Sequence, residues 1–175
     1  SLYTDEANQG YNAYSILLTG KDEHGVFLPV GLRSFGDWKP PLPTYLMIPF
    51  IAFIGLNDIS ARLPSVAAGV GTIILSFYLV KELFKKYQFS IKIALLTAFY
   101  LTISPWHILQ SRAAMLVLIG LFFLILGIYL YLKSFDRPKL LYIGFLSFAL
   151  SIYSYYGLRV ITPLIIIFLI FYYRR

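Results

Sequence analysis

The sequence AAMLVLIGLFFLILGIYLYL, residues 113–132, contains no charged side chain from end to end. About 20 apolar residues are needed for an α-helix to cross the hydrocarbon core of a bilayer. The chain as a whole is 59% hydrophobic, above the usual range of a soluble domain. Further apolar runs occupy residues 42–57, 61–80, 91–109, 139–156 and 158–173. The sequence therefore predicts an all-α, polytopic membrane protein.

The run at 42–57 is the doubtful one, because it is short and Pro49 interrupts it. A helix of about 16 residues is about 24 Å long, which is less than the roughly 30 Å of the hydrocarbon core. We therefore expect a juxtamembrane or re-entrant helix here, followed by about five transmembrane helices. The predicted division is an outer-face loop with juxtamembrane helices, residues 1–60, and a transmembrane bundle, residues 61–175.

The positions of the charged residues restrict how the chain can be oriented in the membrane. If 42–57 does not cross, nine cations share one face: Lys81, Lys85, Lys86, Lys92, Lys133, Arg137, Lys139, Arg174 and Arg175. The opposing short loops hold Arg112 and Arg159. The positive-inside rule then places the nine cations in the cytoplasm and the N-terminal segment at the outer face. If 42–57 crosses, the same rule places the N-terminal segment in the cytoplasm, so charge alone leaves both arrangements open.

Six of the eight acidic residues precede Arg62, and Asp5 and Glu6 lead them. A helix is predicted from Asp5 to Thr19, with Thr4 as N-cap and Gly20 as its end, and residues 20–43 are predicted to be loop. A carboxylate at a membrane surface can accept a proton from an incoming hydroxyl or amine. Acidic residues in a first turn also complement the helix dipole, so the pair admits a catalytic and a structural interpretation.

Cations on the predicted outer face are candidates for binding a phosphate and for stabilising charge on a leaving group. They are Arg33, Lys39, Arg62, Arg112 and Arg159. Span-end arginines also extend toward lipid headgroups, which is the alternative interpretation. The net charge of +7 does not predict nucleic-acid binding, because the basic residues lie between apolar spans and form no single stripe.

Two further residues are candidates for the binding site. Trp38 precedes Lys39-Pro40-Pro41, a stiff extended segment that would present the lysine in a fixed position. His107, near the end of the apolar run 91–109, could be a base or a ligand, although a single histidine at a span end more often only occupies the interface. No D-x-D pair or multi-histidine cluster predicts a metal site, and we expect no cofactor, although Asp5 and Glu6 alone leave metal dependence open.

Several short motifs occur together and in a fixed order. They are Asp5-Glu6, Lys39-Pro40-Pro41-Leu42, Gly55, Arg62-Leu63-Pro64-Ser65, Ser104-Pro105-Trp106-His107 and Ser111-Arg112. In this order the chain resembles the polyprenyl-phosphate-dependent glycosyltransferases of the GT-C architecture. The nearest branch is the group related to protein O-mannosyltransferases and to the lipid A aminoarabinose transferase.

The resemblance implies a partial GT-C module that transfers a sugar from a polyprenyl-phosphate carrier to a protein, glycan or lipid acceptor. By position, Asp5 matches the catalytic carboxylate and Lys39 matches a lysine near the carrier phosphate. Glu6 is a catalytic candidate beside Asp5, and its loss should be the milder one if it serves mainly the helix dipole. Relatives often carry an acid shortly after the Ser-Arg pair, whereas Ala113–Leu118 contain none. One base and a phosphate clamp are sufficient for an inverting transfer.

We therefore expect an integral protein of the cell membrane with an outer-face active site. Ser1 and Arg175 are expected to be the ends of a fragment, with one span upstream and more downstream. The alternative class is a transporter or flippase of a lipid-linked or anionic substrate, which would place its site near mid-membrane with repeats and broken helices. A purely structural membrane subunit is a third possibility, which would leave the acidic segment unexplained.

Overall fold

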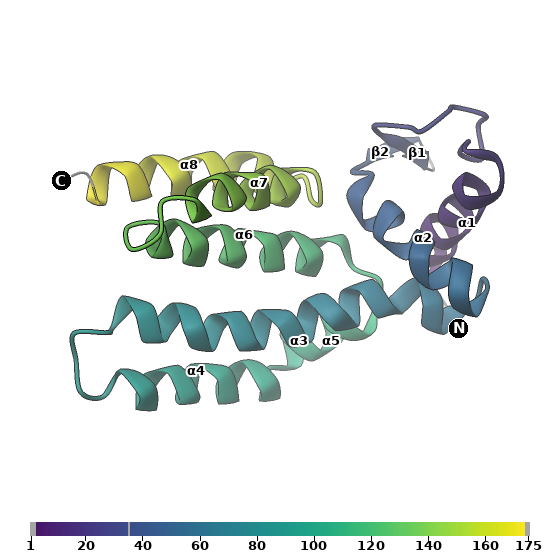
Figure 1. Ribbon diagram of the computed structural model, residues 1–175. Helices are drawn as coiled ribbons and strands as arrows, with labels where there is room; N and C mark the ends of the chain where they lie inside the picture. The colour runs from purple at the N-terminus through teal and green to yellow at the C-terminus, as the bar shows by residue number, and fades with distance from the viewer. Residues whose placement is uncertain (1–2, 35, 174–175) are drawn as a thin grey trace.

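Helices α3 to α8 form an extended antiparallel bundle, with a separate cluster of elements at one end (Figure 1). The computed structural model describes residues 3–34 and 36–173. In this part of the chain the elements are α1 (Thr4–Thr19), β1 (Leu32–Ser34), β2 (Asp37–Lys39), α2 (Leu42–Ile54), α3 (Asp58–Leu83), α4 (Ser90–Ile103), α5 (Pro105–Arg112), α6 (Leu116–Lys133), α7 (Leu140–Ile152) and α8 (Leu158–Tyr172). The predicted all-α membrane architecture is confirmed.

The first helix nearly matches its predicted bounds. Gly20 ends α1 in the left-handed conformation, φ 72°, and donates its N–H to the Ile16 carbonyl, as expected for a C-terminal glycine. The predicted N-cap is wrong by one residue, because Tyr3 holds that position and Thr4 is already helical. Glu6, three residues after Tyr3, accepts a hydrogen bond from the Tyr3 N–H at 2.9 Å, which fixes the start of the helix there.

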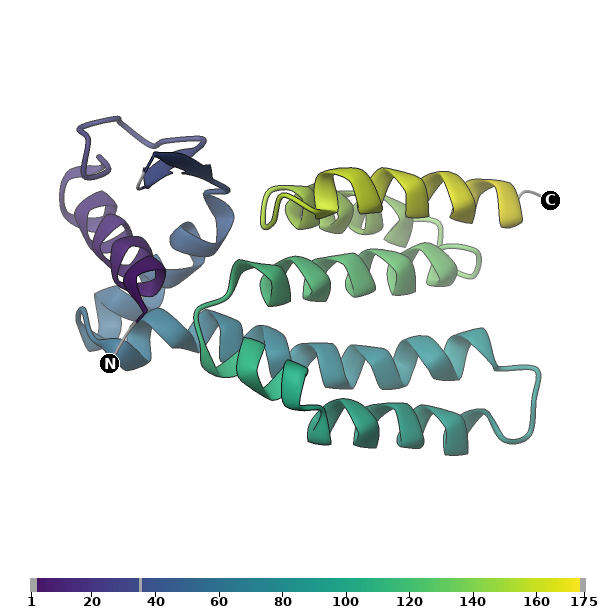
Figure 2. The same cartoon turned by 180° about the vertical axis from the view of Figure 1, so that it is seen from behind.

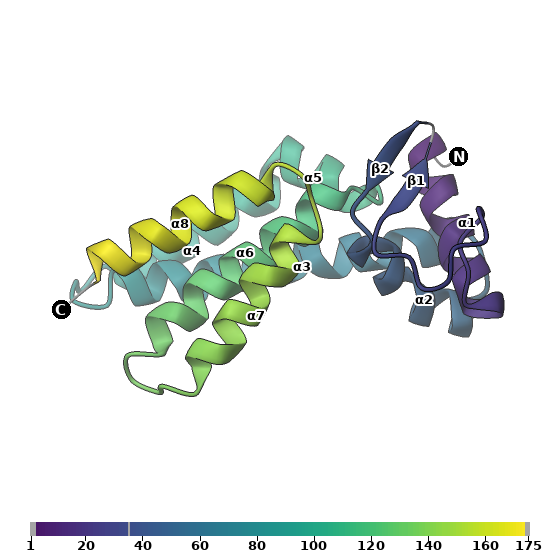
Figure 3. The same ribbon diagram turned by 90° about the horizontal axis from the view of Figure 1, so that it is seen from above.

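The segment predicted as loop contains a short antiparallel hairpin. Strand β1 pairs with β2, with Leu32 opposite Lys39 and Ser34 opposite Asp37. Figure 3 shows the hairpin beside α1. The strands are only three residues long, too short for an alternating pattern to reveal them in the sequence. Their effect is to hold Lys39 next to the first turn of α1.

Helix α2 lies with α1 outside the bundle (Figure 1). Met47 and Ile51 of α2 pack with Ala13 of α1 and with Ala114 in a buried apolar cluster. Pro49 is accommodated inside this helix. Asn57 then starts α3 as an N-cap, accepting the Ile59 and Ser60 N–H groups at 2.9 Å each.

The bundle is built on close contacts at small residues. At Gly127 of α6 a Cβ would lie 2.6 Å from the ring of Phe148, and at Gly120 it would lie 2.3 Å from Leu158. Small residues at such points let helices approach closely where lipid offers no hydrophobic driving force. Phe148 and Leu158 belong to a buried cluster with Leu124 and Leu169. Many apolar side chains of the outer helices are exposed, as expected for surfaces facing lipid.

The predicted span at 91–109 is broken. Pro105 has no N–H and forces Ser104 out of the helical region, to φ −66° and ψ 118°. The axes of α4 and α5 therefore meet at 60°. Figure 2 shows α5 turning along the start of α3. Among the described residues, α3 and α6 are long and apolar enough to cross a membrane alone, and the bent pair makes up to three such spans.

The shorter apolar helices α7 and α8 have 13 and 15 residues, so the count of five spans remains a prediction.

The basic turns and the N-terminal elements lie at different ends of the bundle. The turns after α3 and after α6 lie at the end of the bundle opposite the N-terminal elements (Figure 1). There Glu82 joins α3 to α6 through an ion pair with Lys133, 2.6 Å, and forms a second ion pair with Lys85 of the turn after α3, 2.7 Å. The basic turns and the acidic N-terminal segment therefore occupy opposite ends.

Candidate active site

Glu6 is the central contact of the N-terminal elements. Its carboxylate is almost completely buried and accepts the Arg62 Nε–H at 3.2 Å and the Arg62 Nη2–H at 2.9 Å. It also accepts the Ala114 N–H at 2.6 Å, in the segment between α5 and α6. Burial raises the pKa of Glu6, but the hydrogen bonds from Arg62, Ala114 and Tyr3 outweigh it and the pKa is lowered overall. Glu6 is therefore a charged anchor that ties α1 to α3 and to the α5–α6 segment.

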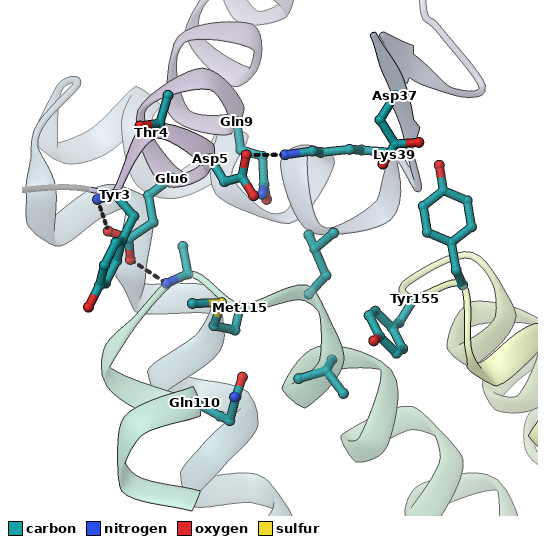
Figure 4. A pocket seen from close by; sticks show the side chains of 14 residues that line it. Tyr3, Thr4, Asp5, Glu6, Gln9, Asp37, Lys39, Gln110, Met115 and Tyr155 are labelled. Carbon is teal, nitrogen blue, oxygen red and sulfur yellow. Dashed lines mark hydrogen bonds and ion pairs between the residues drawn. The ribbon is translucent and has the colours of Figure 1, made fainter. Parts of the chain in front are cut away.

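Asp5, the neighbouring carboxylate, lies on a different side of α1. It forms an ion pair with the ammonium of Lys39, which is 34 residues away in the sequence (Figure 4). The Asp5 side chain is 65% exposed, whereas that of Lys39 is only 11% exposed. The acidic pair is thus divided, with one carboxylate buried and fully bonded and the other accessible from solvent.

A cavity of about 660 Å³ opens beside Asp5 and Lys39. Its floor is an apolar strip formed by Met115, Leu116 and Val117 at the start of α6. This strip lies shortly after Ser111-Arg112, in the segment where the relatives named above often carry an acidic residue. That part of the wall carries no carboxylate. The charged and amide side chains lining the cavity come from elsewhere: Asp5, Glu6, Gln9, Asp37, Lys39 and Gln110.

Two tyrosines of the loop between α7 and α8, Tyr155 and Tyr156, line the side of the cavity toward the bundle. The guanidinium of Arg159 stacks on the Tyr156 ring, with Cζ 4.7 Å from the centroid. Burial raises the pKa of Tyr156, the charge of Asp37 raises it further, and Arg159 opposes the increase. The Tyr156 phenol is therefore neutral at ordinary pH and can act as a hydrogen-bond donor.

Two glutamines at the cavity were not among the predicted site residues. Gln9 belongs to α1 and is 3% exposed, and Gln110 belongs to α5. The Oε1 atoms of both are buried and have no hydrogen-bond partner among the residues that the structure describes. Gln9 follows Asp5 by four residues, so helical spacing could have revealed it. Nothing in the sequence singles out Gln110.

The other predicted site residues are distributed over a wider area. Arg62 binds Glu6, and Arg159 reaches the cavity only through Tyr156. Arg33 and Trp38 face each other across the hairpin, both exposed and both outside the cavity lining. Arg112 is likewise exposed and outside the lining.

His107 is buried between α5 and α3, with Nε2 3.2 Å from the Gly69 carbonyl oxygen. It is not part of the cavity wall. Within the described residues no three His, Cys, Asp or Glu side chains are grouped so that they could hold a metal ion. The groups that meet at the cavity are therefore two exposed carboxylates, one buried carboxylate, one ammonium, two amides, one hydroxyl and three phenols.

A family profile described as dolichyl-phosphate-mannose-protein mannosyltransferase matches residues 38–175, which is most of the chain. The chain belongs to this family. Family membership implies a membrane glycosyltransferase that uses a sugar donor carried on a polyprenyl phosphate. Comparison with curated proteins finds no match, and comparison with solved structures finds none.

The family match includes Lys39, Arg62, Arg112 and Arg159 but begins after Asp5 and Glu6. The two carboxylates lie outside the matched segment in the sequence, but both contact it in the folded chain. Glu6 contacts the segment through Arg62 and Ala114, and Asp5 contacts it through Lys39.

Proposed function

We propose that this chain carries the reaction centre of an inverting glycosyltransferase at the outer face of the cell membrane, with Asp5 as general base and Lys39 as phosphate ligand. The observation that carries the proposal is the pairing of these two side chains at the mouth of the cavity. A base that serves a bulky acceptor must be accessible, and Asp5 is. Its neighbour Glu6 is not.

The proposed step exchanges one bond for another. The acceptor hydroxyl gives its proton to the Asp5 carboxylate as its oxygen forms a bond to the anomeric carbon of the sugar. The bond from that carbon to the phosphate oxygen breaks, and its electron pair leaves with the polyprenyl phosphate. The Lys39 ammonium stabilises the charge that develops there. Attack from the face opposite the leaving group inverts the anomeric configuration.

The ion pair between Asp5 and Lys39 is consistent with this reaction, as the state of the site before the donor binds. A donor phosphate would compete with Asp5 for the ammonium, and its arrival would release the carboxylate toward the acceptor. One base is enough, because a phosphate needs no general acid to leave. A glycoside hydrolase, by contrast, requires two carboxylates flanking the scissile bond.

Two arrangements support the outer face and count against a transporter. The basic turns at the far end of the bundle correspond to the cytoplasmic side under the positive-inside rule. The polar groups of the cavity lie at one end of the bundle, whereas a transporter binds its substrate near the middle of the membrane. Acceptors of any class, whether protein, glycan or lipid, could reach a site in this position.

The test of the base is Asp5→Asn in the full-length protein, assayed for transfer of labelled sugar from a polyprenyl-phosphate donor. Asparagine keeps the size of the side chain, so insertion and donor binding should persist. The transfer rate should fall by about 10²–10⁴, the usual contribution of a general base. The matched control is Glu23→Gln, which removes a carboxylate from the same segment outside the cavity. Near wild-type turnover by Asp5→Asn would eliminate Asp5 as the base.

The test of the phosphate ligand is Lys39→Ala, measured as binding of a short-chain polyprenyl phosphate. A hydrogen bond to a charged group contributes about 1.5–3 kcal/mol, so affinity should fall at least about tenfold. Lys21→Ala removes the same charge from an exposed position outside the cavity and should bind like wild type. Equal affinity in the two variants would contradict the assignment of Lys39.

A further inference from the structure

The two cavity glutamines are unusual because a buried amide normally finds hydrogen-bond partners. Gln9 is 3% exposed, and the buried Oε1 atoms of Gln9 and Gln110 have no partner among the described residues. Leaving a buried polar group without a hydrogen bond is unfavourable. Two such groups at one cavity indicate a ligand that supplies the missing partners.

The positions of the amides define where that ligand lies. Gln9 is one helical turn after Asp5 and extends from α1, while Gln110 extends from α5 on the other side of Met115 (Figure 4). Both line the cavity. A ligand bound between them would lie over Met115 and within one turn of the exposed carboxylate.

The chemistry of the amides restricts what the ligand can be. A glutamine side chain offers one acceptor oxygen and one donor nitrogen group, and a hydroxyl can bond to either. A phosphodiester carries only acceptors and cannot donate a hydrogen bond to the unpartnered amide oxygens, and a prenyl chain has no polar groups. The fitting ligand is therefore a ring with several hydroxyls. The phenols of Tyr155 and Tyr156 on the same cavity add aromatic surface for the C–H faces of such a ring.

We infer that Gln9 and Gln110 bind the hydroxyls of the sugar carried by the donor lipid and thereby select which sugar is transferred. The inference rests on the proposed function and deepens it. The sugar is attached directly to the phosphate, so it must lie beside Lys39 and Asp5. Gln9 follows Asp5 by four residues on α1 and lines the same cavity. An acceptor has to approach the exposed side of Asp5, whereas Gln9 is buried.

The experiment separates the sugar from the lipid phosphate. Binding to the full-length protein is measured for a short-chain polyprenyl phosphate alone and for the same lipid carrying mannose, glucose, galactose or a 4-amino-pentose. We define the sugar preference as the affinity for the tightest-binding sugar-bearing lipid divided by the affinity for the bare lipid. In wild type this ratio should exceed one clearly, because the amides gain partners only from the sugar.

The variants are Gln9→Met and Gln110→Met, which keep the length and volume of the side chain and remove its hydrogen bonds. Each should reduce the sugar preference by about three- to tenfold, the equivalent of a typical hydrogen bond of 0.5–1.5 kcal/mol. Binding of the bare polyprenyl phosphate should stay unchanged. Gln88→Met, an exposed glutamine in the turn after α3, is the matched control and should change neither quantity.

A second measurement needs no variant protein. Donors that lack single sugar hydroxyls are compared on the wild type, and one or two of these deletions should reproduce the loss seen with the glutamine variants. The same deletion should then cost nothing further in the corresponding variant, because the bond it removes is already gone. Additive losses would show that the hydroxyl and the amide do not contact each other.

The outcomes distinguish the inference from the function it rests on. If wild type transfers sugar but the glutamine variants keep the full sugar preference, the inference is overturned and the proposed function stands. The same holds if the variants change only the KM of the acceptor. If wild type binds neither the bare lipid nor any sugar-bearing lipid, both are overturned.

Discussion

Glu6→Gln tests whether the acidic pair is divided into an anchor and a base. The glutamine oxygen can still accept the bonds made by Glu6 Oε1. Its NH₂ group would take the place of Oε2 and face two other donors, the Tyr3 N–H and the Arg62 Nη2–H. Two bonds to a charged group are thereby lost, at about 1.5–3 kcal/mol each.

The lower end of that range applies, because the Arg62 side chain is 30% exposed and water can take the place of a lost partner. We therefore expect Glu6→Gln to destabilise the docking of α1 by about 3 kcal/mol, which raises the undocked fraction about 100-fold. This is a larger effect than the helix-dipole role expected from the sequence. A charge near a helix end typically contributes only about 0.3–1 kcal/mol.

The assay uses a cysteine as a probe of undocking. Ala13 is completely buried against Met47 and Ile51, and the chain has no cysteine of its own. In an Ala13→Cys background with no other cysteine, the rate of alkylation measures how often this contact opens. Glu6→Gln should raise the rate about 100-fold when opening and closing are fast relative to labelling.

The control is Glu23→Gln in the same background. Glu23 accepts hydrogen bonds from Asn8 and Asn12 within the N-terminal elements and, among residues 3–34 and 36–173, makes no hydrogen bond to α3 or to the α5–α6 segment. Its labelling rate should stay close to that of the parent protein. Wild-type labelling of Glu6→Gln, or equal acceleration in both variants, would refute the assignment of Glu6 as the anchor.

Three further predictions use the same protein. Cysteines introduced at Glu23 and Lys86 should be labelled from opposite sides of the membrane, and labelling from one side would overturn the orientation. Because the pKa of Glu6 is lowered in the folded state, the stabilisation that this carboxylate gives is complete above the ordinary carboxyl range and is lost as the pH falls through the lowered pKa. The thermal midpoint of wild type should therefore drop toward that of Glu6→Gln in acid. A difference between the two midpoints that does not change with pH would contradict this. Gly127→Ala should destabilise the bundle by about 1–3 kcal/mol in thermal unfolding, because its Cβ would lie 2.6 Å from buried Phe148, and an unchanged midpoint would show that the ring can move aside.

The helices could largely be predicted from the sequence, because apolar runs and their breakers are local features. Gly20 ends α1 where its conformational freedom predicts an end. The break before Pro105 was less visible, because prolines are also tolerated inside membrane helices, as Pro64 is in α3. The hairpin β1–β2 was missed because its pairing depends on contacts that three residues per strand do not encode.

The site was only partly predictable, for a different reason. The proximity of Asp5 and Lys39 came from a resemblance, since nothing local connects residues 34 positions apart. The contacts of Glu6 with Arg62 and Ala114 span 56 and 108 positions, so they are invisible to any local pattern. Both carboxylates satisfy the same rule for a first helical turn, and burial alone distinguishes them.

This difference in burial links the two carboxylates mechanically. Glu6 fixes the first turn of α1 against Ala114, one residue before the apolar floor of the cavity begins at Met115. Asp5 is the preceding residue of the same turn, so the position of its carboxylate relative to that floor depends on the Glu6 contacts. A displacement of about 1 Å at a reacting group can cost about 10²-fold in rate. Glu6→Gln should therefore lower the transfer rate although Glu6 never touches the acceptor, and donor affinity, which depends on Lys39, should fall less than kcat. Equal losses in affinity and kcat would mean that Glu6 supports the whole cavity and not the base in particular.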